Sequence, residues 1–563
     1  MLLLLALLLA SEAAPPPPST GKEAPQAAAP KLPTEAEARA MLAKVVAAAK
    51  PATRDCKTLI APWTRVLLAL ARPEAAEVKK NSEGYLWLAR CAEKQKYYVL
   101  LGDIGALMLA SDPKGGHPEL LARAYVGLNS PRLALGLLDK AQKFAAKDPD
   151  VALTRAKVFC RVRDWKQCLA AAEQTVKLGA KLKGPAKNEV LNRAHKYRAR
   201  ALLHTGKLPE AAKAVAESDK LGGDAEDLIE VRKSLVPAKA YGALVETEHM
   251  PMVALGIFHL IGKHEGSKPL VRVYLDNVGE DRQFRIEASI DGVTQVQTKT
   301  ETVLKGQSIV ADLTPPLAAT FDLVGMRAAR RAQLSIRVLS VAQTTEAVVH
   351  QDSEEIELQP RDFLPTAAFV DEEKAMAENL NMFMAAWVTP TAKAVEAFLA
   401  EAKTRAPRNT FAGEQSATIP QVQAIYDSLK AKGVSYVMNP ETASGNGYGQ
   451  RARLPAEVLA TTNAQCLEGA ILYATLMEAI GLQPAIVLVP GHAFVGWHAT
   501  EQDDPKLKDK YLFLETTMTH DAPFEAAMKV GLAEFDEAFA KKKARVLMLP
   551  ALRKAGIAPQ PYD

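Results

Sequence analysis

The sequence lacks the features that mark membrane spans, nucleic-acid binding and metal sites. Beyond the N-terminal residues, no stretch is long and apolar enough to cross a bilayer as a helix. The net charge is only +5 over 563 residues, and Lys and Arg are interleaved with Asp and Glu. The histidines have no metal-ligand spacing, and no calcium-loop signature is present. We therefore expect no membrane span after signal removal, no nucleic-acid partner, and no metal or other cofactor.

Cysteine is also scarce, with five in the chain. One of them, Cys466, stands alone in the C-terminal part, and the other four are Cys56, Cys91, Cys160 and Cys168. In an oxidising compartment four cysteines can pair and leave one free thiol. A Cys160–Cys168 bridge across a helical hairpin is conceivable, but the sequence cannot establish its geometry. Four unpaired core cysteines are an equally good interpretation, because free Cys is commonly buried.

The N-terminus begins with a short apolar run, Leu2–Ala10, which is typical of the hydrophobic region of a signal peptide. Small residues follow at the cleavage position, although the usual basic residues before the run are missing. No Cys follows the run, which argues against lipid attachment. We expect residues 1–13 to be a signal peptide and 14–33 a disordered Pro/Ala-rich spacer. The predicted localisation is periplasmic or secreted.

The length of the chain predicts two to four domains. In the first, residues 34–240, small residues recur on a fixed grid with a period of 34 residues and one insertion. The three copies are Ala122, Ala134 and Ala141; Ala156, Cys168 and Thr175; and Ala199, Ala211 and Ser218. This pattern resembles tetratricopeptide repeats, whose paired helices need small residues where they touch. The alternative is an irregular helical bundle in an Ala-rich chain.

Repeats of this kind stack into curved arrays that bind peptides or partner proteins. We therefore expect a protein or peptide partner for residues 34–240 and no catalytic residue within them. His117, His195 and His204 are interpreted as solvated or capping residues rather than ligands. Residues 243–362 then change to a period of two, in short Val/Ile/Thr-rich segments separated by Asn, Asp, Gly and Pro. This alternation predicts a small β-sandwich without a site of its own.

The C-terminal domain, residues 363–563, holds the candidate chemistry. Cys466 precedes a predicted helix, Leu467–Ile480, and a predicted buried strand covers Ala485–Val489. His492 opens the next strand after a Pro-Gly turn, and a third strand, Tyr511–Leu514, leads directly into Glu515. A thiol at a helix N-terminus is favoured as thiolate, an imidazole can shuttle its proton, and a carboxylate can orient the imidazole. Further on, Ala533–Lys543 reads as an amphipathic helix that caps the domain.

Four motifs between about residues 385 and 519 give this region a family resemblance: AAWVTP, QRARLPAEVL, CLEGAILYATLMEAIGLQPAIVLVPGHAFVG and FLETT. Together they resemble the bacterial transglutaminase-like superfamily of cysteine enzymes, which has a papain-like α+β fold. The resemblance implies that Cys466 is the nucleophile and His492 its general base. Glu515 stands where the family usually has Asp.

Two further roles stay open. Gln450 or Gln465 is a weak candidate donor to an oxyanion, with the Cys466 N–H as the second donor. His498 lies on the same strand face as His492 and is the alternative base, but His492 directly follows the Pro-Gly turn, where the family places its histidine.

The expected architecture is therefore multidomain, with a tetratricopeptide-like helical solenoid, a small β-sandwich and a transglutaminase-like α+β domain. The function implied is that of an exported thiol enzyme that acts on peptide or protein amides through a thioester. Either water or an amine would resolve the thioester, which makes the protein a peptidase or amidase in one case and an acyltransferase in the other. The alternative is a non-catalytic envelope scaffold that keeps the fold as a binding module.

Overall fold

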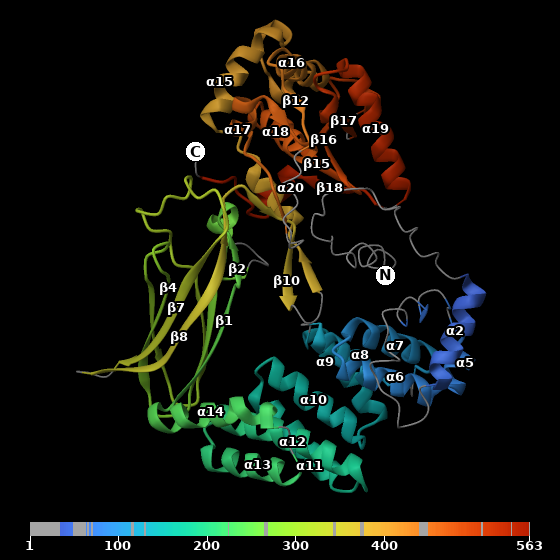
Figure 1. Cartoon of the computed structure of the whole chain (residues 1–563), viewed down its shortest axis with the longest axis vertical. Helices are drawn as coiled ribbons and strands as arrows, with labels where there is room; N and C mark the ends of the chain where they lie inside the picture. Colours follow the sequence, from blue (N-terminus) through green and yellow to red (C-terminus); the bar gives the residue numbers. More distant parts are fainter. Residues whose placement is uncertain are drawn as a thin grey trace, which may run out of the picture.

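The computed structural model describes residues 34–48, 64, 67–68, 71, 73–113, 117–128, 131–222, 225–263, 268–341, 345–371, 376–438, 449–507, 510–541 and 543–561. The predicted signal peptide, the spacer and Cys56 lie outside these residues. Three units follow one another along the chain: a helical array, a pair of β-sheets and a C-terminal α/β unit (Figure 1). None of the helices within the described ranges is long and apolar enough to span a membrane.

The N-terminal unit is an array of helices in which α2 packs against α6, and each helix from α5 onward packs against the next (Figure 1). Its helices are α2 (Glu35–Ala48), α5 (Ala75–Lys80), α6 (Ser82–Lys94), α7 (Tyr98–Ser111), α8 (Pro118–Gly127), α9 (Pro131–Phe144), α10 (Pro149–Arg161), α11 (Trp165–Gly179), α12 (Pro185–His204), α13 (Leu208–Lys220) and α14 (Ala225–Tyr241). All nine small residues of the sequence grid are at most 1% exposed. Their burial is what a helical repeat requires, because only small side chains let paired helices approach closely.

The three described cysteines of this array are disulfide-bonded. A disulfide joins Cys160 in α10 to Cys168 in α11, and Cys91 is also disulfide-bonded. Cys466 is the one free cysteine of the described residues. Of the two interpretations of the sequence, paired or unpaired cysteines, the structure therefore has the disulfide between Cys160 and Cys168 at the α10–α11 hairpin.

Two sheets make up the middle unit and enclose one apolar core between them. The three-stranded sheet has the order β1 (Ala243–His249), β3 (Val271–Asn277) and β6 (Ser308–Leu313). The five-stranded sheet has the order β2 (Met252–Ala254), β8 (Glu346–Gln359), β7 (Arg330–Val341), β4 (Arg282–Ile290) and β5 (Gln297–Val303). Alternating burial along β4 shows the reason for the period of two, since every second side chain faces the core.

A buried charge cluster joins the helical array to the first sheet. The Nδ1 of His204 lies 2.5 Å from a carboxylate oxygen of Asp276, and its Nε2 lies 3.3 Å from Glu246. Arg163 donates to both carboxylates, and the Trp165 ring stacks on His204 with 3.9 Å between centroids. The sequence analysis interpreted His204 as a solvated or capping residue, and that interpretation is wrong. It was missed because the partners of His204 come from strands 42 or more residues further along the chain.

The C-terminal unit is built around a four-stranded antiparallel sheet with the order β17 (Tyr511–Leu514), β16 (His492–His498), β15 (Pro484–Val489) and β18 (Arg545–Met548). The buried helix α18 (Cys466–Ala479) packs on β15 and β16, and α19 (Phe524–Ala540) packs on β17. Figure 1 shows this unit at the top of the molecule. The other α-helices are α15 (Lys393–Ala402), α16 (Thr418–Ala431), α17 (Pro455–Thr461) and α20 (Leu549–Lys554).

Short elements complete the same unit. The small paired strands are β9 (Phe363–Pro365) with β13 (Gly449–Arg451), β10 (Ala367–Asp371) with β11 (Met376–Asn379), and β12 (Ser435–Tyr436) with β14 (Asn463–Ala464). The 3-10 turns are η3 (Asn381–Trp387), η4 (Lys403–Arg405), η5 (Pro407–Asn409), η6 (Gly413–Gln415), η8 (Pro505–Leu507) and η9 (Thr516–Met518).

One segment of the middle region belongs to two cores. In β2 and the following 3-10 helix η1 (Leu255–Leu260), Val253 and Phe258 pack between the two sheets, whereas Ile257 and Leu260 pack into the C-terminal core. Gly256 lies so close to the C-terminal unit that a Cβ there would meet the Trp387 ring at 2.8 Å. The boundary between the two units is therefore a packed interface rather than a linker.

Three predicted elements have different bounds in the structure. Helix α18 is Cys466–Ala479 rather than Leu467–Ile480, and α19 is Phe524–Ala540 rather than Ala533–Lys543. Strand β15 begins at Pro484 rather than Ala485. The earlier start of α19 was missed because Gly531 interrupts the amphipathic pattern, and glycine is a poor helix former. In the structure, close packing of this glycine against β17 offsets its low propensity.

The charge cluster predicts a stability difference between two aspartates of the same sheet. Asp276→Ala removes a side chain that is 2% exposed and leaves Arg163 and His204 without a buried partner. We expect a loss of about 3 kcal/mol in the free energy of unfolding, measured by urea denaturation with circular dichroism. The control is Asp312→Ala, which breaks the exposed Arg272–Asp312 pair and should cost less than about 1 kcal/mol. Equal midpoints for the two variants would contradict this assignment.

Candidate active site

Cys466 is the first residue of α18, and the local sequence fixes where that helix begins. Glu468, three residues after Gln465, accepts the Gln465 backbone N–H at 3.1 Å, as in a helix-capping box. Arg453 donates to both oxygens of Glu468, at 2.9 and 2.7 Å, so this buried carboxylate is paired. Because α18 is buried from Leu467 to Met477, the helix start cannot shift without moving the core.

His492 is placed opposite the helix start by a tight turn. Gly491 adopts φ +75°, a left-handed conformation that favours glycine, and it reverses the chain between β15 and β16. His492 pairs with Val489 in the resulting ladder, so its position at the start of the inner strand β16 is fixed by strand pairing. The imidazole is half-buried and its Nε2 lies 2.7 Å from Oε2 of Glu515.

Glu515 directly follows β17 and caps the short helix η9. Its Oε1 accepts the backbone N–H of Thr517 at 2.9 Å and the Thr517 hydroxyl at 2.5 Å. Its Oε2 is thereby left for His492. The carboxylate is 2% exposed and each of its oxygens has a donor, so the side chain is held in one orientation. Close packing of α18 on η9 supports this arrangement, since a Cβ at Gly469 would come within 2.9 Å of the Thr516 hydroxyl.

The electrostatics of the three side chains favour a thiolate–imidazolium pair. Burial alone would raise the pKa of the Cys466 thiol, but the hydrogen bond and charge of His492, with the N–H groups of Ala493 and Leu467, lower it overall. The hydrogen bonds that His492 donates to Cys466 and Glu515 raise its pKa to about 10 despite its burial. The pKa of Glu515 is lowered: burial opposes ionisation, but the bonds from His492 and Thr517 outweigh it.

The structure thus brings Cys466, His492 and Glu515 together in a chain of contacts. It places His498 elsewhere, at the far end of β16, where its ring packs edge-on against Tyr511 with 5.8 Å between centroids. There it lines a hollow of about 300 Å³ together with Glu414 and Gln483. His492 is therefore the histidine that contacts the thiol.

The two glutamine candidates occupy different places. Gln465 immediately precedes the thiol, and its side-chain amide nitrogen donates to the Arg451 carbonyl at 2.9 Å, which leaves one amide hydrogen for another acceptor. Gln450 lies in β13 opposite Leu364, and no hydrogen bond among the described residues joins it to the triad. Of the two, only Gln465 is next to the nucleophile in the chain.

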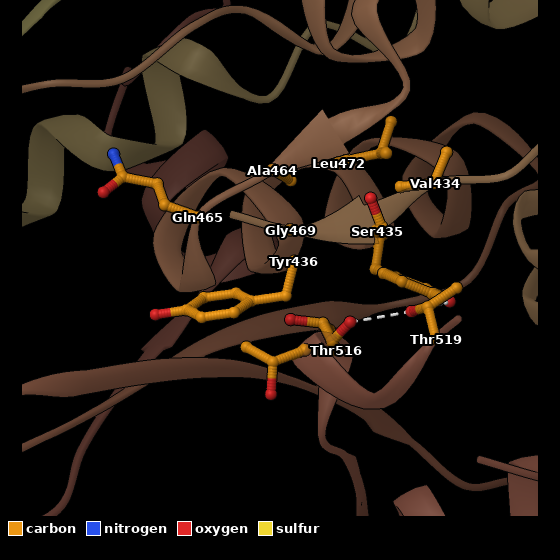
Figure 2. A pocket seen from close by; sticks show the side chains of 11 residues that line it. Val434, Ser435, Tyr436, Ala464, Gln465, Gly469, Leu472, Thr516 and Thr519 are labelled. Atoms are coloured by element: carbon orange, nitrogen blue, oxygen red, sulfur yellow. Dashed lines mark hydrogen bonds between the residues drawn. The ribbon is translucent and has the colours of Figure 1, made fainter. Parts of the chain in front are cut away.

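A small cavity of about 10 Å³ lies beside the triad, between α18, η9 and β12. Figure 2 shows Gln465 and Tyr436 at one side and Thr519 at the other, where the Thr519 hydroxyl donates to the Thr516 carbonyl at 2.7 Å. Thr517, the residue that binds Glu515, also lines this cavity. The cavity has room for about one water molecule and not for a peptide.

A fourth ionisable residue of the site, Glu534 in α19, was missed in the sequence. One of its carboxylate oxygens lies 3.6 Å from Nε2 of His492. The polar atoms of His492, Glu515 and Glu534 all lie within 4.8 Å of one another, and this is the one group in the described ranges with the composition of a metal site. The 2.7 Å separation of His492 and Glu515 is that of a hydrogen bond, whereas two ligands of one tetrahedral zinc ion lie about 3.3 Å apart. We therefore assign no metal to it.

Comparison with known proteins adds little to this geometry. No family model matches the chain, and no curated protein matches it. Among solved structures, the chain is similar to a thermophilic TPR protein from Thermus thermophilus, with 19% identity and a TM-score of 0.23. The match covers 37% of this chain and 100% of that chain. A TM-score this low carries no argument, so the helical repeat rests on the 34-residue spacing and on the buried grid of small residues.

The pKa shifts predict the reactivity of Cys466 with iodoacetamide. The free thiol of native protein should be alkylated at a rate that rises with pH through a midpoint below the ~8.5 of an ordinary thiol. The reason is that His492 stays protonated up to about pH 10 and stabilises the thiolate throughout that range. Peptide-resolved mass spectrometry measures the rate at Cys466 without mutating the disulfide cysteines. In His492→Ala the midpoint should move to higher pH, because only the backbone N–H groups of Ala493 and Leu467 then oppose the effect of burial; an unchanged profile would refute the ion pair.

Proposed function

We propose that this protein is an exported, transglutaminase-like thiol enzyme that acts on peptide or protein amides through a thioester. The observation that carries the proposal is the contact chain from Cys466 through His492 to Glu515, with the thiol at the first residue of a buried helix. A buried, inert cysteine would not need an imidazole and an oriented carboxylate beside it. The family resemblance of the motifs around these residues supports the same reaction class.

The chemistry follows from the positions of the three groups. The Cys466 thiolate attacks the amide carbonyl carbon, and the negative charge that develops on the oxygen is stabilised by the N–H groups at the start of α18 and by the free amide hydrogen of Gln465. His492 gives its proton to the leaving nitrogen as the C–N bond breaks, which releases the amine and leaves a thioester. Water or a second amine then attacks the thioester, gives a proton to His492, and restores the thiolate.

Glu515 acts on the imidazole. Because its Oε2 accepts from Nε2 of His492, the ring presents Nδ1 to the thiol. The carboxylate also stabilises the imidazolium that exists before attack and again after the thioester is resolved. Glu can replace the usual Asp of the family here because Thr517 holds its second oxygen.

Two features outside the site support export and partner binding. The Cys160–Cys168 disulfide and the bonded Cys91 belong in an oxidising compartment such as the periplasm or the exterior. The helical array resembles scaffolds that bind peptides or proteins along a curved surface. We propose that it recruits the protein substrate or a partner, while the C-terminal unit performs the reaction.

A substrate assay tests this function. The wild-type protein is incubated with a Gln-containing protein such as casein, and both ammonia release and incorporation of a fluorescent primary amine are measured. Amine incorporation identifies an acyltransferase and ammonia release without it identifies an amidase, and new N-termini identify a peptidase. Cys466→Ala should reduce any of these rates by at least about 10³-fold, with an unchanged circular dichroism spectrum.

The matched control is Cys160→Ala with Cys168→Ala, which removes two cysteines remote from the triad. Its activity should follow the wild type at a temperature where it is folded. If Cys466→Ala keeps the wild-type rate, the thiol mechanism is wrong. If the wild-type thiol is slow to alkylate and no amide is processed, the protein is a binding scaffold that retains the fold.

A further inference from the structure

Glu534 is in an unusual position for a carboxylate. Its side chain is 38% exposed, yet its Oε2 is buried, has no hydrogen-bond donor among the described residues, and lies 3.6 Å from the Nε2 of His492. The same imidazole nitrogen already binds Glu515. Two carboxylates therefore face one nitrogen of the residue that activates the thiol.

The fold places Glu534 there through a rigid contact with the triad. The backbone N–H of Glu515 donates to the Ala527 carbonyl of α19 at 3.1 Å. One turn further on, Gly531 packs so tightly against β17 that a Cβ would come within 2.9 Å of the Leu514 nitrogen and 3.0 Å of the Glu515 nitrogen. Residues three apart on a helix share a face, so Gly531 brings Glu534 to the triad.

The next residue of the helix fixes its rotation. The Phe535 ring stacks on Phe513 of β17, with 4.1 Å between centroids and 17° between planes. A helix held by a backbone hydrogen bond, a close glycine contact and a ring stack cannot turn Glu534 away from His492 without breaking that packing.

We propose that Glu534 is a second carboxylate partner of the His492 imidazolium and thereby a positioning residue for the thiolate–imidazolium pair. The active arrangement then consists of one thiol, one imidazole and two carboxylates. This inference rests on the proposed function only for the thiolate–imidazolium pair; the contact of Glu534 with His492 is independent of any substrate.

The charges around Glu534 agree with this role. Burial and the neighbouring Glu515 raise its pKa, Glu537 on the same helix adds to the rise, and His492 opposes it. When its carboxyl is ionised, a second negative charge faces the imidazolium. As the pH falls through the raised pKa of Glu534, the proton it takes up can bridge to Glu515, and the support for His492 is lost.

The test uses iodoacetate, whose alkylation rate at Cys466 reports the ionisation of both the Cys466 thiol and the His492 imidazole. The rate rises as the thiolate forms and falls when His492 loses its proton, because the imidazolium attracts the anionic reagent. In wild-type protein we expect the falling limb near pH 10, the pKa of His492. In Glu534→Gln, which preserves shape and removes the charge, we expect that limb to move down by about one unit.

Two further variants complete the design. Glu537→Gln makes the same charge change on the same helix, at an exposed residue that pairs with Lys541, and should leave the falling limb in place. Gly531→Ala changes no charge but forces α19 away from β17, and should shift the limb in the same direction as Glu534→Gln.

The outcomes separate this inference from the proposed function. A wild-type profile without an acid-shifted rise means that the thiol is not activated, which overturns both. An acid-shifted rise with coincident falling limbs in wild type and Glu534→Gln leaves the thiol enzyme standing and overturns the role of Glu534. Equal shifts in Glu534→Gln and Glu537→Gln also overturn it, because the effect would then be a general loss of surface charge.

Discussion

The hydrogen bond between His492 and Glu515 is the interaction on which the site depends. It joins His492, at the start of β16, to Glu515, just after the end of the neighbouring strand β17, with 2.7 Å between Nε2 and Oε2. This bond also selects the ring nitrogen that faces Cys466. Each surrounding element holds either the imidazole or the carboxylate of this hydrogen bond in place. The Pro-Gly turn and the β15–β16 ladder hold the imidazole, while η9 and α19 hold the carboxylate. The thiol is then set against this pair by α18, whose burial prevents any shift of its first turn.

Packed contacts also join the three units of the chain to one another. The helical array meets the first sheet through the buried cluster of His204, Asp276 and Arg163. The sheets meet the C-terminal unit through η1, whose side chains pack into two cores. Both junctions are therefore packed interfaces.

Much of the architecture follows from local patterns in the sequence. The spacing of small residues predicted helix pairs in the N-terminal region, and those residues are buried at the helix contacts. The alternation in residues 243–362 predicted strands, and Tyr511–Leu514 has the predicted bounds. These features are readable because they depend on one face of one element, with a period of 3.6 or two residues.

By itself the sequence determined the order of thiol, imidazole and carboxylate on a helix, a strand and the next strand. Only the tertiary structure decided which histidine contacts the thiol, since His492 and His498 have the same parity on β16 and differ only in the end of the strand they occupy. It also decided where Glu534 and His204 lie and which charged groups face them. No local period signals either one, because Glu534 reaches the site through Gly531 packing on β17, and the carboxylates that face His204 come from another unit. Local periodicity in one sequence indicates which face of a helix or strand is buried. It does not indicate which other element packs against that face, so contacts between elements come only from the tertiary structure.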